Sequence, residues 1–430
     1  MRTPMNLRRL IATAALLLAL AEARAEVEAD ADTSLWTRWL TGERALDAFL
    51  PAKKDWSDKG LGIGGSYTTD LLGNPVGGRK QGFTYYGSLQ LILAADLEKL
   101  AGWHDGYFVA TMFDSAGNNL SRNYIGNYFN VTEVASIPTV VLGQVYFEQR
   151  LFDEKVSVKV GRMGVGSDFV VMDMFNLYVG GIDGHTPVFV WNTFWSGAAT
   201  PTWAAVVKGE PHDDVTLRLG VFQATTANRV IANHGMNMEF NPSDGVEIFG
   251  EAGLKTKLRT AWDDGAAMPG EHKFGGYWSS WEYAAFGGGT AAETYGMYWI
   301  GQQMVWRERK EADEGVTLWY SFVYAPTDNV SRFPFFSGAG AGWQGAIPGR
   351  DQDWILFGSY AGTMSGEFAS AHEAKGLGDP TYEWVLEWDY RAQITPWLYV
   401  MPCAQWIINP GGTGRIANAL VLGAEIGVTF

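Results

Sequence analysis

The chain has 430 residues with a formal net charge of −15, and only 18% of its residues are charged. Its negative balance argues against a nucleic-acid partner and against an anion channel. Aromatic residues make up 14% of the chain and 53 residues are glycine, a composition that favours many strands and turns over helices. The single cysteine, Cys403, excludes an internal disulfide.

Residues 1–25 are predicted to be a secretory signal peptide. Three arginines precede an apolar stretch at 10–20, and the motif A-R-A at 23–25 fits a cleavage site before Glu26. No later run approaches the roughly 18 apolar residues of a transmembrane helix. Residues 26–56 do not alternate between apolar and polar, and we expect a short helical, periplasmic segment there before the main domain at 57–430.

The segment 382–394, YEWVLEWDYRAQI, has the clearest strand pattern. One face of the expected strand is apolar and aromatic, with Tyr382, Trp384, Leu386, Trp388, Tyr390, Ala392 and Ile394. The other face is polar or charged at most positions and includes Glu383, Glu387, Asp389 and Arg391. A strand with aromatic residues on one face and charges on the other is typical of a barrel wall between lipid and a wet lumen.

The last residues, ALVLGAEIGVTF at 419–430, alternate in the same way. Leu422, Ile426 and Phe430 lie on the apolar face, whereas Glu425 lies on the opposite one. We expect this strand to face lipid and to pair with the first strand, which closes a barrel in the outer membrane of a Gram-negative bacterium.

The connections between the expected strands alternate in length, as they do in outer-membrane barrels. If the first strand begins near Leu61, the short connections lie at 151–154, 209–214, 308–314 and 395–396. The long connections lie at 115–139, 163–201, 224–245, 326–351 and 409–418. About fifteen strands are evident and one more is assigned near 365–372. Since single-chain bacterial barrels have even strand numbers, we predict an all-β antiparallel transmembrane barrel of sixteen strands.

Six stretches carry a family resemblance. They are ADLEKLAGWHDGYF (95–108), YFEQRLFDEKVSVKVGRMGVGSDF (146–169), HKFGGYW (272–278), TYGMYWIGQQ (294–303), ITPWLYVMPCAQWIINPGG (394–412) and NALVLGAEIGVTF (418–430). Together they resemble the carbohydrate-selective porin family, the OprB-like sugar porins. The resemblance implies a passive porin that admits monosaccharides such as glucose, whereas alternation by itself indicates only the barrel.

One stretch departs from the family pattern. Family members often have a proline-rich segment after the motif SDF, whereas this chain has PVFVWNTFWSGAATPTW at 187–203. That stretch belongs to the connection 163–201, which we expect to fold inward as a constriction. The resemblance therefore supports the fold more strongly than it supports a particular selectivity.

A sugar pore needs acids, bases and aromatic rings, because sugar hydroxyls form hydrogen bonds and sugar C–H faces stack on rings. Strand parity selects the wall candidates Gln144, Tyr146, Glu148, Lys159, Arg218, Glu247, Glu251, Glu387, Asp389 and Arg391. Asp168 and Trp195 are candidates from the inward-folding connection. Glu148 and Arg162 are the first choices for the constriction, although Arg162 has the wrong parity relative to Lys159 unless the strand ends or bulges near Gly161. Lumen charges also often serve only to stabilise a barrel wall.

Two alternatives remain open at this stage: a general or ion-selective diffusion porin of the same fold, and a secreted soluble sugar-binding β protein. The sequence shows no nucleophile–base pair for a barrel enzyme and no metal-ligand spacing, so we expect no enzyme activity, cofactor or metal. The glycines of GAGAGWQG (338–345) lack the strand-to-helix context of a nucleotide loop. Expected partners are small carbohydrates, outer-membrane lipid and lipopolysaccharide, and the assembly machinery through Phe430. Association into a homotrimer is left open.

Overall fold

The computed structural model describes residues 35–134, 138–241, 243–259, 267–308 and 314–430. The predicted signal peptide lies outside these residues. Two short helices, α2 (Leu35–Thr41) and α3 (Ala52–Asp58), precede the first strand, as the sequence predicts. This segment packs against the turn after β16, where the Trp397 indole N–H donates to the carbonyl of Trp39 at 2.8 Å.

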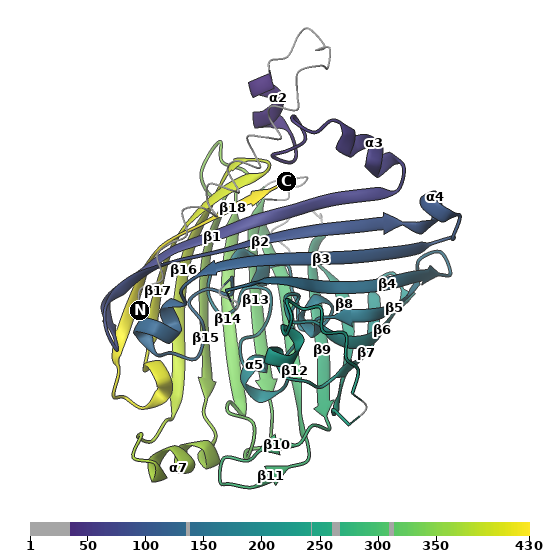
Figure 1. Cartoon of the computed structure of the whole chain (residues 1–430). Coiled ribbons are helices and arrows are strands. Elements are labelled where there is room, and N and C mark those ends of the chain that lie inside the picture. Colours follow the sequence, from purple (N-terminus) through teal and green to yellow (C-terminus); the bar gives the residue numbers. More distant parts are fainter. Residues whose placement is uncertain (1–34, 135–137, 242, 260–266, 309–313) are drawn as a thin grey trace.

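Sixteen antiparallel strands form one closed barrel, as predicted (Figure 1). The strands are β1 (Leu61–Gly78), β2 (Gly82–Asp96), β3 (Gly106–Gly117), β4 (Val140–Leu151), β5 (Val156–Met163), β6 (Thr202–His212), β7 (Val215–Gln223), β8 (Val246–Leu258), β9 (Met268–Ser279), β12 (Thr294–Arg307), β13 (Gly315–Tyr324), β14 (Phe335–Gln344), β15 (Trp354–Thr363), β16 (Tyr382–Thr395), β17 (Leu398–Ile408) and β18 (Ala417–Thr429). Each strand pairs with the next barrel strand along the chain.

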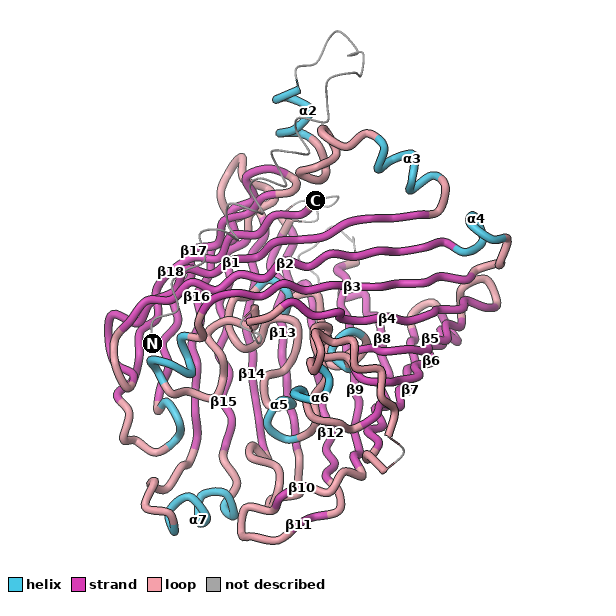
Figure 2. The backbone as a smooth tube through the Cα atoms, viewed as in Figure 1, coloured by secondary structure: helices cyan, strands magenta, loops and turns pink. Residues whose placement is uncertain are grey.

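Short elements decorate the connections (Figure 2). They are α4 (Leu97–Ala101), α5 (Phe189–Asn192), α6 (Ala227–Val230), α7 (Gly366–Ala374) and a separate two-stranded sheet of β10 (Tyr283–Ala284) and β11 (Thr290–Ala291). Within the described ranges, none of the helices has the length and apolar character that crossing a bilayer requires.

The seam between β1 and β18 closes the barrel. Asp70 pairs with Glu425 in its register, and the backbone groups of Phe430 and Gly65 exchange two hydrogen bonds of 2.9 Å each. A closed barrel leaves no unpaired strand edge, which is the condition for a sheet to survive in hydrocarbon. The terminal phenylalanine therefore takes part in the closure itself.

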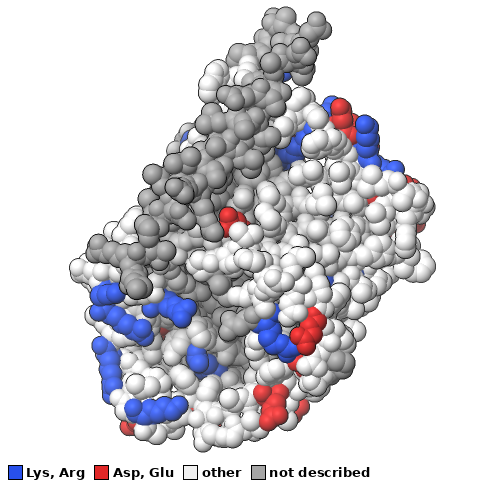
Figure 3. All heavy atoms as spheres, viewed as in Figure 1, with Lys and Arg blue, Asp and Glu red and all other residues white. Residues whose placement is uncertain are grey.

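Strand alternation sorts the side chains as the sequence predicts. On β16 the indoles of Trp384 and Trp388 are 37% and 45% exposed, whereas Glu383 and Glu387 are fully buried inside the barrel. On the face shown in Figure 3, charged side chains gather toward the two ends of the barrel and the band between them carries few. An uncharged outer band of this kind suits contact with lipid.

Two strand assignments from the sequence are wrong. The sixteenth strand is β14, which lies within the stretch 326–351 that the sequence assigned to one long loop. The segment 365–372, assigned as a strand, belongs to helix α7, which Ser365 begins by accepting a hydrogen bond from the N–H of Phe368 at 3.0 Å. The glycine-rich sequence of β14 hid its alternation, because glycines on the inner face give no polar signal.

We expect deletion of Phe430 to impair barrel assembly, because it removes both backbone hydrogen bonds to Gly65 at the seam. The measurement is the amount of folded barrel in outer-membrane fractions, read from heat-modifiable mobility on gels. The variant Phe430→Tyr keeps the backbone and an aromatic ring and should assemble normally. Wild-type amounts of folded barrel after the deletion would contradict this account of closure.

Candidate functional site

The connection 164–201 between β5 and β6, hereafter the inner loop, folds into the barrel (Figures 1 and 2). Its residues Phe169, Phe175 and Phe189 have no exposed surface and contact aromatic rings of the wall on β8, β12 and β13. Burying one phenylalanine side chain contributes roughly 1.5–3 kcal/mol. Apolar packing therefore fixes the inner loop against one side of the wall, as the prediction of an inward-folding connection requires.

Hydrogen bonds to the wall also hold the inner loop in place. The Tyr178 hydroxyl donates to a backbone carbonyl of β15 at 2.8 Å and accepts from the indole N–H of Trp319 at 2.7 Å. The carboxylate of Glu387 accepts the backbone N–H groups of Val179 at 3.1 Å and Gly180 at 2.6 Å. Each of these hydrogen bonds provides a partner for a buried polar group of the inner loop.

Three predicted lumen residues also anchor the inner loop. Glu247 accepts the N–H of Phe194 at 2.9 Å, and Glu251 accepts the N–H of Val170 at 3.1 Å. Gln144 accepts the first N–H of the inner loop at 3.1 Å. All three side chains face the lumen, yet each is at least nine-tenths buried. Their evident role is structural support of the constriction.

Glycines on the inner face of the wall make room for the inner loop. A Cβ atom on Gly342 would lie 2.6 Å from the methyl group of Met174, and one on Gly358 would lie 3.1 Å from the ring of Tyr178. On Gly340 it would lie 2.5 Å from an indole nitrogen of the wall. Gly342 of GAGAGWQG and Gly358 of β15 therefore allow close packing between loop and wall, whereas Gly340 makes room for the wall residue Trp319.

Four predicted residues meet in one polar group beside the inner loop. Lys159 Nζ lies 2.7 Å from Asp168 Oδ1 and 5.5 Å from the centroid of the Tyr146 ring. Glu148 pairs with Lys159 across β4 and β5, and its carboxylate accepts from the Ser157 hydroxyl at 2.7 Å. The side chains of Lys159, Glu148 and Asp168 are 20%, 14% and 12% exposed, so they are open to the lumen.

Arg150 and Tyr107 extend this group. The guanidinium of Arg150 lies 4.3 Å from the centroid of the Tyr107 ring, and its Nε lies 3.4 Å from Glu148 Oε1. We call Tyr107, Tyr146, Glu148, Arg150, Lys159 and Asp168 the lumen cluster. Tyr107 was not among the sequence candidates, although the alternation of GYFVAT at 106–111 would have placed it on the inner face.

The remaining wall candidates divide between two places. Arg218 Nη1 lies 2.8 Å from Glu251 Oε1, and its side chain is 17% exposed. Arg391 and Asp389 face the lumen from β16, on the other side of the barrel from β5. There the guanidinium of Arg391 lies 3.5 Å from the centroid of the Tyr399 ring. These residues do not join the lumen cluster.

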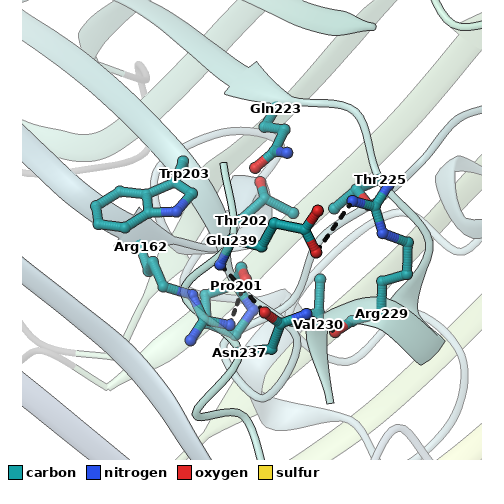
Figure 4. A pocket seen from close by; sticks show the side chains of 10 residues that line it. All are labelled: Arg162, Pro201, Thr202, Trp203, Gln223, Thr225, Arg229, Val230, Asn237 and Glu239. Carbon is teal, nitrogen blue, oxygen red and sulfur yellow. Dashed lines mark hydrogen bonds and ion pairs between the residues drawn. The ribbon is translucent and has the colours of Figure 1, made fainter. Parts of the chain in front are cut away.

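Arg162 lies apart from the lumen cluster. The register of β4 and β5 continues without a bulge and pairs Arg162 with Val145, on the opposite face from Lys159. Its guanidinium donates to the carbonyls of Gly235 and Pro201, beneath the connection 224–245 (Figure 4). The small cavity there holds about 20 Å³ and is also lined by Trp203. The position of Arg162 thus differs from the expectation that it meets Glu148 at the constriction, because Gly161 does not interrupt the strand.

Trp195 lies in the inner loop, half-buried. Its indole stacks on the imidazole of His185 at 4.9 Å with an interplanar angle of 9°, and the Phe189 ring lies 5.2 Å away. Desolvation lowers the pKa of His185 to about 4, so this ring is neutral at physiological pH. Trp195 therefore contributes to the stiffness of the inner loop.

A second aromatic group lies where several long connections meet. The guanidinium of Arg332 lies 4.5 to 5.0 Å from the ring centroids of Tyr128, Trp191 and Phe368. Desolvation lowers the pKa of Arg332. These residues come from four different connections, so sequence spacing gives no signal for their meeting.

Comparison with known proteins agrees with this architecture. The family model described as "Carbohydrate-selective porin, OprB family" matches residues 80–430. Porin B of Pseudomonas aeruginosa is 26% identical, with 90% of this chain and 93% of that protein covered.

Two solved structures of OprB from Pseudomonas putida share the fold. The high-pH structure has a TM-score of 0.80 at 24% identity and covers 88% of this chain and 96% of its own. The low-pH structure has a TM-score of 0.60 at 20% identity and covers 91% of this chain and 99% of its own. Because the family model spans most of the sequence, this chain belongs to the carbohydrate-selective porin, OprB family, and is a passive outer-membrane channel for small carbohydrates.

Proposed function

We propose that monosaccharides such as glucose cross the barrel by diffusion along the lumen cluster. The observation that carries this proposal is the arrangement of two aromatic rings beside two acids and two bases, several of them partly open to the lumen. Carboxylates accept from sugar hydroxyls, ammonium and guanidinium groups donate to them, and ring faces stack on sugar C–H groups.

The ion pairs within the lumen cluster keep sugar binding weak. Lys159 is already paired with Asp168, and Arg150 with Glu148, so a sugar replaces part of an existing interaction instead of filling empty donors. A millimolar dissociation constant corresponds to about −4 kcal/mol. Weak binding of this order suits a pore, because a passing solute must leave as readily as it enters.

The inner loop sets the width of the path. Its buried aromatic residues and its anchors at Glu247, Glu251 and Glu387 give it one position against the wall. A constriction of fixed shape discriminates solutes by size without any conformational step, which fits passive diffusion.

A general or ion-selective pore of the same fold is the competing proposal. The aromatic stretch 187–203 favours it, because this stretch replaces the proline-rich segment that the family resemblance implies. Current that is indifferent to sugar would support this alternative.

The other proposed partners lie outside the lumen. The exposed Met236 and Phe240 project from the connection 224–245, which covers Arg162 on the outer side of the barrel, and we propose that they contact outer-membrane lipid or lipopolysaccharide. Recognition of Phe430 by the assembly machinery and association into a homotrimer stay predictions.

We expect glucose to reduce the single-channel current of the purified protein in a planar bilayer, with saturation in the millimolar range. The variant Glu148→Gln should raise the half-blocking glucose concentration by about threefold to tenfold, equivalent to roughly 0.6–1.4 kcal/mol, because one charged hydrogen-bond acceptor is lost. The control Arg162→Lys should leave the glucose block unchanged, since Arg162 lies outside the lumen. Open current that glucose never reduces would reject sugar preference but leave the channel.

We expect Phe189→Ala to loosen the constriction. The Phe189 ring is fully buried against Trp195 and Tyr298, and truncation of a buried phenylalanine costs about 3–5 kcal/mol. Single-channel conductance and current noise should both rise, and glucose should block less strongly. Val190→Ala is a suitable control, because the neighbouring Val190 side chain is 43% exposed. Conductance and noise equal to wild type in Phe189→Ala would show that the inner loop is held by other contacts.

A further inference from the structure

The aromatic group around Arg332 lies at the outer end of the barrel. We call its members the arginine cage: Arg332, Tyr128, Trp191 and Phe368. Trp191 belongs to α5 of the inner loop, and Phe368 belongs to α7, which Figure 1 shows at the end of the barrel opposite α3 and the C-terminus. A solute that enters from outside therefore meets the arginine cage before the lumen cluster.

The charge of Arg332 has no counterion. Its side chain forms no ion pair within the described residues, and its Nε is buried without a hydrogen-bond partner there. Desolvation lowers the pKa of Arg332, yet an arginine remains charged at physiological pH. Ring faces attract a cation, but they do not replace the opposite charge that a desolvated ion requires.

The acid closest to the arginine cage is already satisfied. Glu383 acts electrostatically on Tyr128, but its carboxylate accepts the backbone N–H groups of Tyr128 at 2.9 Å, Phe129 at 2.7 Å and Gly411 at 2.8 Å. Its side chain is fully buried. Glu383 therefore stabilises the backbone around the arginine cage and does not neutralise Arg332.

A second basic residue adds to the positive charge. Arg79, in the turn between β1 and β2, is exposed, and its side chain lies against Gly126 in the connection that carries Tyr128. The charges of both Arg79 and Arg332 act on Tyr128. This part of the outer end is thus positive, although the chain as a whole carries a net charge of −15.

Direct hydrogen bonds hold the arginine cage in one arrangement. The indole N–H of Trp191 donates to the carbonyl of Tyr128 at 3.1 Å, and the N–H of Ser365 donates to the carbonyl of Arg332 at 2.9 Å. The side chain of Asn192 exchanges two hydrogen bonds, of 2.8 and 3.0 Å, with the backbone of the residue after Arg332. A site fixed in this way loses little freedom when a ligand binds.

The chemistry of the arginine cage suits an acidic sugar. Rings that lie over a guanidinium leave the N–H groups at its edge available, and this edge matches the two oxygens of a carboxylate. Arg332, Tyr128 and Trp191 are only half-buried, so a solute can reach them. Aromatic rings beside the carboxylate can then pack against the C–H face of a sugar ring.

We propose that the arginine cage binds a monosaccharide that carries a carboxylate, such as a uronate or an aldonate, through the edge of the Arg332 guanidinium. The inference rests on the proposed function, since it places a second sugar site at the outer end of a sugar channel. The two sites differ in solute class. The lumen cluster has paired acids and bases and suits neutral sugars, whereas the arginine cage has a cation without a partner.

Another arginine over an aromatic ring is a poorer anion site. The guanidinium of Arg391 lies 3.5 Å from the centroid of the Tyr399 ring. The hydroxyl of the same tyrosine donates to Glu425 at 2.7 Å, and the charge of Arg391 acts on that carboxylate. An anion at Arg391 would therefore meet a carboxylate of the wall.

The test measures binding to the full barrel, purified in detergent, by isothermal titration calorimetry at low ionic strength. The ligands are glucuronate, its neutral amide glucuronamide, and acetate. Glucuronate should bind at least about tenfold more tightly than either of the other two, because only glucuronate offers both the charge and the sugar ring. Added NaCl should weaken glucuronate binding and should affect glucuronamide far less.

Variants then assign the binding to the arginine cage. Arg332→Gln should bring the affinities for glucuronate and glucuronamide to about the same value, and Arg332→Lys should keep part of the difference, because lysine keeps the charge but lacks the planar fork. The matched control is Arg415→Gln. Arg415 is exposed, lies in the connection between β17 and β18 and donates to the carbonyl of Gly376 at 2.8 Å, so this variant should bind glucuronate like wild type.

Four results would overturn the inference. Equal affinity of wild type for glucuronate and glucuronamide would do so without any variant, and acetate binding as tight as that of glucuronate would leave only an anion site. The third is a glucuronate preference that persists in folded Arg332→Gln, which would mean that Arg332 only holds the connections together. The fourth is a loss of preference in Arg415→Gln equal to that in Arg332→Gln. Glucose block of the current alongside any of these results would preserve the proposed function, whereas binding and block by no sugar would reject both.

Discussion

The structure depends on one constraint: in hydrocarbon, every backbone N–H and C=O must find its partner within the sheet. Pairing β1 with β18 satisfies that constraint, and Phe430 completes the seam through its exchange of hydrogen bonds with Gly65. Closure then divides each strand into an outer face for lipid and an inner face for the lumen. The inner faces of sixteen strands enclose a space too wide for wall side chains to fill, so the inner loop has to occupy it.

Filling the lumen places two opposite demands on the wall. Where the inner loop packs, the wall needs small residues and acceptors, which Gly342, Gly358 and Glu387 supply. Where solute passes, the wall needs partly exposed polar groups, which Glu148 and Lys159 supply. Inward-facing charge thus has two distinct uses in one barrel. Burial separates them, since the loop anchors are almost fully buried and the lumen cluster is not.

Alternation in the sequence predicted much of this division and missed the rest for physical reasons. A period of two is a local property, so the inward positions of Tyr146, Glu148 and Lys159 could be predicted from sequence and agree with the register. Strict alternation places Arg162 on the face opposite Lys159, as the register has it. Its assignment to the constriction required a bulge or a strand end near Gly161, and the strand has neither. Burial, by contrast, depends on which loop packs against which strand. The separation of anchors such as Glu247 from exposed lumen residues therefore could not be predicted.

Two groups of inward-facing charges differ in how they are compensated. In the lumen cluster each acid lies beside a base, as with Lys159 and Asp168, so the local field is short-ranged. On β1 and β18, Asp70 and Glu425 meet each other instead of a base. That pair is almost fully buried, so a solute in the lumen meets mainly the paired charges of the lumen cluster. Paired charges offer hydrogen bonds to a neutral sugar without a strong net field, whereas an ion gains most from unpaired charge. The compensation of charge along the path therefore favours uncharged solutes.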